Sequence, residues 1–223
     1  MELPPPLDLL PLLLPGLWMT LLITAGGCVV ALVAALAAGL GRRSQDVIIR
    51  SVATIYIETF RGTSALVQLY WFYFALPLLL GIRLDAVLVG ILVLGLNIGA
   101  YGAEVVRAAI NAVSPGQRAA AKALNLSPWQ TMRHVVLPQA VVMMLPPFGN
   151  LLIELLKSTA LVSMITVSDL TRVGIVIRDD THRTVAVLSM LLVIYFLIAS
   201  VLSAGMRALE KRMTRGLDYG GSA

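Results

Sequence analysis

Residues 184–206, TVAVLSMLLVIYFLIASVLSAGM, form a run of 23 residues without a charge, bounded by Arg183 and Arg207. A helix that crosses the hydrocarbon core of a bilayer needs about 20 apolar residues, and a charge inside it costs a few kcal/mol. This run is therefore long enough and apolar enough to be one transmembrane helix.

Four further runs of this kind occur along the chain. They contain 33 uncharged residues between Asp8 and Arg42, 21 between Arg61 and Arg83, 18 between Asp85 and Glu104, and 19 between His134 and Glu154. Hydrophobic residues make up 58% of the 223 residues and charged residues 13%, whereas soluble proteins average about half and a quarter. We predict an all-α polytopic membrane protein with about five transmembrane helices.

Prolines crowd the N-terminus, at positions 4, 5, 6, 11 and 15. Proline fits a loop better than a helix interior, so residues 1–15 are expected to form a periplasmic or interfacial segment and the helix to start near Gly16. A cleaved signal peptide is not expected, because Glu2 and Asp8 stand in place of a basic region. The transmembrane domain is expected at residues 16–212, and a cytoplasmic tail at 213–223.

Basic residues are distributed unevenly between the two sides of the predicted bundle. Twelve lie in segments 41–63, 107–134 and 207–215, and five lie in the alternating segments. Because cytoplasmic loops are enriched in Lys and Arg, the N-terminus is expected outside and the C-terminus in the cytoplasm. The excess of 17 basic over 12 acidic residues thus reports topology, and no nucleic-acid partner is expected.

Two moderately apolar stretches lie outside the five runs. Residues 47–60 are expected to form a helix that leads into the second transmembrane segment. Residues 159–177, interrupted by Asp169 and Arg172, are expected to form short interfacial helices on the outer side.

Sequence signatures of metal and nucleotide sites are absent. One cysteine and two histidines, Cys28, His134 and His182, leave no convincing metal site. No G-x-x-x-x-G-K-[ST] motif occurs, so any ATP that drives this protein must be held by another chain. No cofactor is expected in this chain.

The stretch between the third and fourth runs contains two helix-start signals. Residues 114–117 (SPGQ) combine an N-cap serine, a proline at the first helical position and a glutamine at the third, which is typical of a capping box. Residues 127–130 (SPWQ) repeat the pattern, and Asn125 can adopt the left-handed conformation that ends a helix. The short helix is either a connector that lies against the protein's own surface or a docking element for a soluble partner.

Several motifs resemble those of one transporter family. Residues 119–121 (AAA), Asn125 and residues 135–138 (VVLP) resemble the EAA signature of permease subunits of ATP-binding-cassette (ABC) importers, written E-A-A, three residues, G, nine residues, I-x-L-P. Residues 61–69 (RGTSALVQL), 101–107 (YGAEVVR), 137–140 (LPQA) and 145–150 (LPPFGN) resemble the polar amino acid branch, which includes histidine, glutamine, arginine and ectoine systems. The resemblance covers about residues 15–212 and implies the type I ABC importer permease fold in a bacterial inner membrane.

In that family the short cytoplasmic helix couples the permease to its ATPase. The resemblance places this coupling helix at about residues 115–126, with ATPase contacts at Arg118, Ala119, Ala120, Ala121, Lys122, Leu124, Asn125 and Leu126. Ala119 replaces the family glutamate, and Asn125 replaces the family glycine. Because a carboxylate is lost, docking is expected to depend on shape, on Leu126, and on the charges of Arg118 and Lys122.

Three pairs of opposite charge lie near the ends of the predicted helices. They are Glu58 with Arg61, Glu104 with Arg107, and Glu154 with Lys157. Residues three apart share a helix face, so each pair is either an ion pair that anchors a helix end or part of a translocation path. Glu154 is the main path candidate, because Pro146 and Pro147 are expected to break the helix before it and open a polar pocket.

Asn97 lies in the middle of the third run. It is either a hydrogen-bond partner for a neighbouring helix or a group that lines the path with Glu58, Arg61, Glu104, Glu154 and Lys157. The first alternative is favoured, because Gly95, Gly99 and Ala103 form a ridge of small residues suited to close helix packing.

The resemblance implies a transport subunit and no enzyme. It implies a dimer with a second permease, identical or paralogous, and a translocation path at their interface. ABC ATPase subunits would hold ATP and Mg²⁺, and a periplasmic or lipid-anchored substrate-binding protein would deliver a polar amino acid or a solute such as ectoine. ATP turnover in these partners would then drive alternating access.

Two other classes of protein are alternatives. An ion-coupled secondary transporter or channel would use Glu58, Glu104 and Glu154 for coupling, but no inverted repeat is obvious and the capped helix would have no role. A membrane-embedded enzyme is least favoured, because the spans offer no nucleophile, base and orienting group in a recognisable pattern.

Overall fold

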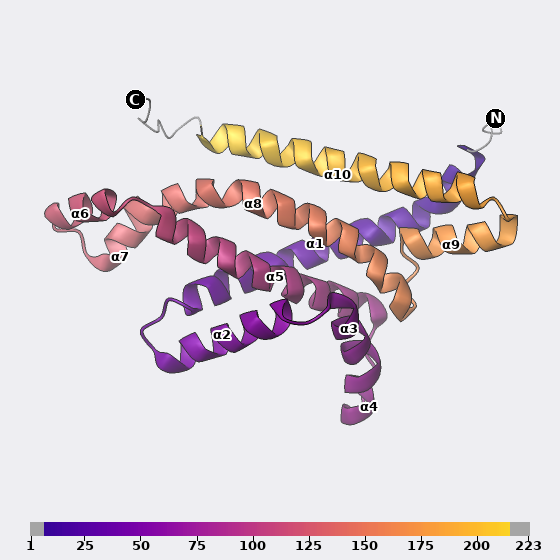
Figure 1. Cartoon of the computed structure of the whole chain (residues 1–223), viewed down its shortest axis with the longest axis horizontal. Coiled ribbons are helices and arrows are strands. Elements are labelled where there is room, and N and C mark those ends of the chain that lie inside the picture. Colours follow the sequence, from indigo (N-terminus) through magenta and orange to yellow (C-terminus); the bar gives the residue numbers. More distant parts are fainter. Residues whose placement is uncertain (1–6, 215–223) are drawn as a thin grey trace.

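The structure is a computed structural model that describes residues 7–214. These residues form helices joined by short turns, with no strand among them, which confirms the predicted all-α class. Most of the helices lie lengthwise in an elongated bundle, and α3 and α4 project from it (Figure 1). The elements are η1 (Leu7–Leu9), α1 (Leu10–Gly41), α2 (Val47–Arg61), α3 (Ala65–Tyr70), η2 (Trp71–Ala75), α4 (Leu76–Leu80), α5 (Ala86–Ala112), α6 (Pro115–Ala123), α7 (Pro128–Thr131), η3 (Met132–Val136), α8 (Leu137–Ser158), η4 (Thr159–Ile165), α9 (Leu170–Thr181) and α10 (Thr184–Thr214).

Helices α1 and α5 pack closely at the centre of the bundle. A Cβ added to Gly95 would lie 2.6 Å from the Cβ of Val30, and one added to Gly99 would lie 2.8 Å from the Cβ of Ala34. Only hydrogen fits at these positions, so the glycines set how closely the two helices approach. The predicted ridge of small residues on α5 is confirmed.

The close pair also fixes how the chain must run. Successive glycines of α5 meet successively later residues of α1, so the two helices run in the same direction. The chain between them has to return across the bundle, and it does so through α2 and the segment α3–η2–α4. These two parts are bent by 105° at residues 62–64.

The number of spans agrees with the prediction. Within residues 7–214, four segments are long and apolar enough to cross a membrane, at Leu10–Gly41, Ala86–Ala112, Pro128–Ile165 and Thr184–Thr214. The bent pair of α2 with α3–η2–α4 makes up to five. The helix predicted to lead into the second span is confirmed as α2. The apolar run between Arg61 and Arg83 forms the helical segment α3–η2–α4, which meets α2 at the bend of 105°.

Prolines interrupt the helices less than the sequence suggested. Helix α1 begins at Leu10 and not near Gly16, because Pro11 lies in the first turn, where its missing N–H is not needed. Helix α8 likewise continues through Pro146 and Pro147, so the helix break expected before Glu154 is wrong. Neighbouring helices hold both segments in helical form, as they commonly do around prolines in membrane proteins.

The bundle has two distinct ends, which we name by the short helices that they carry. The α6 end carries α6, α7 and the C-terminal ends of α1, α5 and α10, whereas the α9 end carries α9 and the start of α1 (Figure 1). At the α9 end, η4 and α9 confirm the short helices predicted for residues 159–177. There Arg183 pairs with Asp8 at 2.7 Å. Of the predicted tail, residues 213 and 214 belong to α10, and residues 215–223 lie outside the described residues.

We expect Gly95→Ala to destabilise the bundle. The new methyl group would lie 2.6 Å from the Cβ of Val30 and 2.9 Å from the carbonyl oxygen of Gly27, so it would force α1 and α5 apart. Such overpacking costs about 1–3 kcal/mol, against about 1 kcal/mol gained in helix propensity. The matched control is Gly205→Ala in α10, where no atom lies within 4 Å of the added Cβ. Thermal unfolding in detergent should show a lower midpoint for Gly95→Ala alone, and equal midpoints would contradict the packing argument.

Candidate coupling and translocation sites

Helix α6 is closed at both ends by hydrogen bonds. At its start the Oγ of Ser114 accepts the backbone N–H two residues later, at 3.3 Å. At its end the N–H of Leu126 donates to the carbonyl of Ala121 at 3.1 Å, and the N–H of Asn125 donates to that of Lys122 at 3.0 Å. This is a Schellman motif, and Asn125 provides its left-handed residue with φ at 59°. The predicted role of Asn125 in ending the helix is confirmed.

The turn that follows leads directly into a second capped helix. The N–H of Gln130 donates to the Oγ of Ser127 at 3.2 Å, and the N–H of Ser127 donates to the Oε1 of Gln130 at 2.8 Å. The capping box predicted here is confirmed. At the start of α6 the Ser114 side chain accepts the N–H of the second helical residue. No hydrogen bond from the Gln117 side chain to the backbone N–H of Ser114 is present within residues 7–214, so the capping box predicted there is incomplete. Helices α6 and α7 thus form a compact hairpin with defined ends.

The coupling residues predicted from the sequence differ in where they face. Ala119, Ala120, Lys122, Leu124 and Asn125 are exposed, Ala121 is buried, and Arg118 and Leu126 are half-buried. The guanidinium of Arg118 turns inward and donates to the carbonyl of Ile110 in α5. Of the two charges expected to dock a partner, only Lys122 therefore faces outward.

The hairpin exposes two large apolar side chains. Leu124 is 75% exposed and Trp129 is 69% exposed, although both stand beside tightly capped turns. Leu124 belonged to the predicted contact set, whereas Trp129 did not. The position of Trp129, directly after the helix-starting Pro128, could have indicated that its side chain is exposed. A side chain in the first turn of a short helix at a loop tip has few neighbours to cover it.

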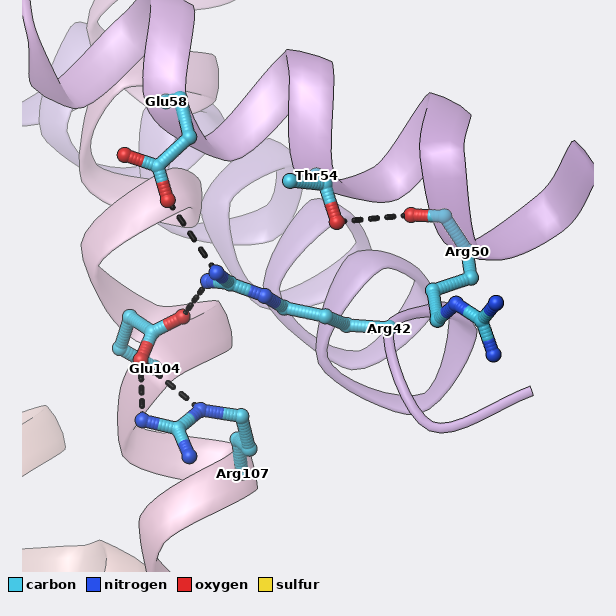
Figure 2. A network of polar contacts seen from close by, with 6 residues as sticks. All are labelled: Arg42, Arg50, Thr54, Glu58, Glu104 and Arg107. Atoms are coloured by element: carbon cyan, nitrogen blue, oxygen red, sulfur yellow. Dashed lines mark hydrogen bonds and ion pairs between the residues drawn. The ribbon is translucent and has the colours of Figure 1, made fainter. Parts of the chain in front are cut away.

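The charged residues of α2 and α5 form a network around Arg42, the residue after α1. Arg42 bonds to Glu104 of α5 and, at 3.2 Å, to Glu58 of α2, while Arg107 holds the other oxygen of Glu104 at 2.7 Å (Figure 2). The predicted pair of Glu104 with Arg107 is confirmed. The predicted pair of Glu58 with Arg61 is wrong, because Arg42 takes the carboxylate of Glu58. The network ties α1, α2 and α5 together at the α6 end.

The remaining predicted charges have other surroundings. The guanidinium carbon of Arg61 lies 5.3 Å from the centre of the Tyr101 ring, a cation–π contact. Glu154 and Lys157 are both exposed, and no salt bridge joins them among the residues that the structure describes. Their predicted ion pair is wrong, because the two side chains do not meet although they share a helix face.

One side of α2 carries a polar stripe, which we define as Arg50, Thr54, Glu58 and Arg61. Its members recur every three or four residues, and the first three project to the same side of the helix, toward Arg42 (Figure 2). Arg50, Glu58 and Arg61 are exposed. Exposed charges on a membrane helix are too costly to face lipid, so such a stripe suits an aqueous cavity or another protein.

The bend between α2 and α3 is stabilised by two amide side chains. The Nδ2 of Asn97 donates to the carbonyl of Phe60 at 3.0 Å and to the Oε1 of Gln68 at 3.1 Å. The Nε2 of Gln68 donates to the carbonyl of Phe60 at 2.9 Å and to the Oγ1 of Thr63 at 2.7 Å. Asn97 is 8% exposed, so the structure supports the interhelical role that was favoured and brings it to the bend, away from an open surface.

The surroundings of Pro146 and Pro147 are apolar, in contrast to the polar pocket expected there. A cavity of about 360 Å³ lies between α1, α8 and α10 at this level, lined by side chains that include Leu32, Leu145, Phe148, Leu152 and Met206. Glu154 does not line it. No group of three or more His, Cys, Asp or Glu side chains in the described part of the chain could hold a metal ion.

Comparisons with known proteins agree with this arrangement. The family described as "Binding-protein-dependent transport system inner membrane component" matches residues 27–215. The "Probable amino-acid ABC transporter permease protein y4tF" of Sinorhizobium fredii is 47% identical, over 90% of this chain and 86% of its own length. The "Glutamine transport system permease protein GlnP" of Escherichia coli K12 is 41% identical, over 92% of this chain and 94% of its own.

A solved structure has the same fold. The crystal structure of an amino acid ABC transporter with histidines superposes with a TM-score of 0.86 at 36% identity, covering 92% of this chain and 96% of that one. The family match begins within α1 and extends over the later spans and the α6–α7 hairpin. The chain therefore belongs to the family of binding-protein-dependent transport system inner membrane components, as a relative of amino acid ABC transporter permeases.

Proposed function

We propose that this chain is the permease subunit of an ATP-driven importer in a bacterial inner membrane, for polar amino acids or a related solute such as ectoine. The observation that carries the proposal is the α6–α7 hairpin, which exposes the apolar side chains of Leu124 and Trp129 at one end of the bundle. An exposed apolar group on a rigid support is typical of a protein docking surface. ABC ATPase subunits are its proposed partners, and they hold the ATP and Mg²⁺.

The ATPase contact follows from which residues of the hairpin are free. The methyl groups of Ala119 and Ala120 allow a close approach, Leu124 and Trp129 offer apolar area, and Lys122 offers one charge. Arg118 is excluded from direct contact because its guanidinium is bonded to α5. ABC ATPase subunits lie in the cytoplasm, so docking on the hairpin requires the α6 end to face the cytoplasm. The excess of basic residues predicted for that side supports the same orientation.

The polar stripe of α2 supports a path between two permeases. A second copy or a paralogue placed against α2 would enclose the stripe in an aqueous cavity, away from lipid. Arg50 and Arg61 have no carboxylate within salt-bridge distance among residues 7–214, so this cavity carries excess positive charge. Positive charge suits the carboxylate shared by amino acids and ectoine. A substrate-binding protein would deliver the solute at the α9 end.

The proposed cycle is alternating access driven by rigid-body motion. ATP binding draws the two ATPase subunits together, and the docked hairpins carry their bundles with them. The cavity then opens toward the binding protein, and hydrolysis resets it. No bond of the substrate is broken by this chain, which acts as a transport subunit.

Ala120→Trp should separate ATP hydrolysis from uptake. The indole would prevent close approach of the ATPase at an exposed position of α6, without disturbing the fold of the permease. We expect uptake into proteoliposomes containing the permease, its cognate ATPase and binding protein to fall at least tenfold relative to ATP hydrolysed. Ala208→Trp, also exposed at the α6 end but on α10, is the control. Normal ATP-dependent uptake by Ala120→Trp, or uptake that follows an ion gradient without ATP, would refute the proposal.

Trp129→Ala should weaken ATPase binding. Truncation of a tryptophan at an interface commonly costs 2 kcal/mol or more, which corresponds to about a 30-fold loss of affinity. Titration of the purified permease with its cognate ATPase measures this loss. Trp18→Ala is a matched control, because Trp18 is also 69% exposed but lies near the α9 end. The contact is absent if both variants bind the ATPase with wild-type affinity.

Arg61→Gln should slow transport without loss of folded protein. Arg61 makes a cation–π contact with Tyr101 and has no carboxylate partner among residues 7–214, so its guanidinium can bind a substrate carboxylate. A hydrogen bond to a charged group contributes about 1.5–3 kcal/mol, so uptake at low substrate should fall at least tenfold. Arg207→Gln, an exposed arginine of α10, is the control. Equal uptake by the two variants would remove Arg61 from the path.

A further inference from the structure

The side chain of Arg118 joins two helices that meet at a corner. It leaves α6 in the direction of the bundle, and its Nη2 donates to the carbonyl of Ile110 in the last turn of α5. No other side chain of α6 makes a hydrogen bond to α5 within the part of the chain that the structure describes. Arg118 is therefore the polar link across the corner formed by Val113 and Ser114.

The C-terminal end of α5 has a specific need for this link. The last four carbonyls of a helix lack partners within the helix, and many helices satisfy them through a left-handed residue or a basic side chain in the last turn. Helix α5 has neither, because Val113 is extended with ψ at 124° and the last turn carries no basic residue. The guanidinium of Arg118 supplies both the hydrogen bond and the positive charge that the helix dipole favours.

The corner rests on a rigid base. Ile110 is 0% exposed and Val113 is 1% exposed, and they pack in one cluster with Val136 and Ala140 from η3 and α8. On α6, Ala121 is only 2% exposed. The Nε of Arg118 is buried without a hydrogen-bond partner, a cost that few native groups carry without a reason.

We propose that Arg118 is a positioning residue that fixes the angle between α6 and α5, so that a force on α6 moves α5 as one body with it. Without the link, α6 would pivot about residues 113 and 114, which join the two helices. Movement of the hairpin would then change the angle between α6 and α5 and would not move α5. The inference rests on the proposed coupling of α6 to an ATPase. It assigns Arg118 to transmission within this chain and leaves contact with the partner to Leu124, Trp129 and Lys122.

The first experiment measures the corner without any partner. Spin labels on Ala108→Cys and Ala123→Cys, both exposed, report the distance between α5 and α6 in a Cys28→Ser background. Arg118→Met keeps the length of the side chain but removes the guanidinium, so the distance distribution should broaden. Lys122→Met removes a charge from the same helix without touching α5, and its distribution should stay as narrow as that of the parent. Equal distributions for Arg118→Met and the parent would overturn the proposal.

The second experiment measures transmission in the assembled importer. For Arg118→Met we expect substrate imported per ATP hydrolysed to fall at least fivefold, while the amount of bound ATPase stays within twofold of wild type. Lys211→Met removes an exposed charge from α10, outside the hairpin, and should leave the ratio within twofold. Arg118→Lys, which keeps the charge, should recover part of it. An unchanged ratio in Arg118→Met, or an equal loss in Lys211→Met, would overturn the proposal.

The two results separate this inference from the function on which it rests. If Ala120→Trp transports normally, α6 is not the ATPase contact and the proposed function fails, whatever Arg118 does. If Ala120→Trp is uncoupled while Arg118→Met keeps its coupling ratio, the proposed function holds and the positioning role alone is lost.

Discussion

Hydrocarbon offers no hydrogen-bond partner, and this one property of the bilayer accounts for most of the arrangement of the chain. Every polar group at membrane depth must find its partner within the protein, so the spans are helices and their contacts are made by small residues. The close approach of α1 and α5 follows, because Gly95 and Gly99 let two backbones meet without a polar contact. The parallel direction of this pair then requires a returning segment, which α2, α3 and α4 provide.

The returning segment shows how the same constraint permits an exception. The bend of 105° at residues 62–64 frees backbone groups inside the bundle, which would be costly in lipid. Gln68 and Asn97 remove this cost by donating to the carbonyl of Phe60. A polar residue in the middle of a span can therefore serve the fold, and its presence alone is weak evidence for a substrate path. Charges on an exposed helix side, as on α2, are stronger evidence, because Arg50, Glu58 and Arg61 remain exposed within residues 7–214.

The sequence predicted those features that depend on near neighbours in the chain. Charge-free runs predicted the spans, Asn125 predicted the end of α6, and Ser127 with Gln130 predicted the start of α7. These signals depend on residues that are close together in the sequence. Contacts between distant segments were missed. Glu58 had an arginine three residues away, yet it pairs with Arg42 from another helix, and nothing in local spacing distinguishes the two partners. The effect of Pro146 and Pro147 was misjudged for the same reason, because packing around α8 decides whether the helix survives them.

The location of Arg118 connects the two sites. Ile110, which receives its hydrogen bond, lies six residues after Glu104 on α5, a separation of about 9 Å along a helix. Glu104 in turn holds Arg42, and Arg42 holds Glu58 on the polar stripe of α2. Displacement of α5 would thus reach α2 through side chains already in contact. Because Glu58 is 61% exposed at the end of this series, its pair with Arg42 is the contact that solvent screens most.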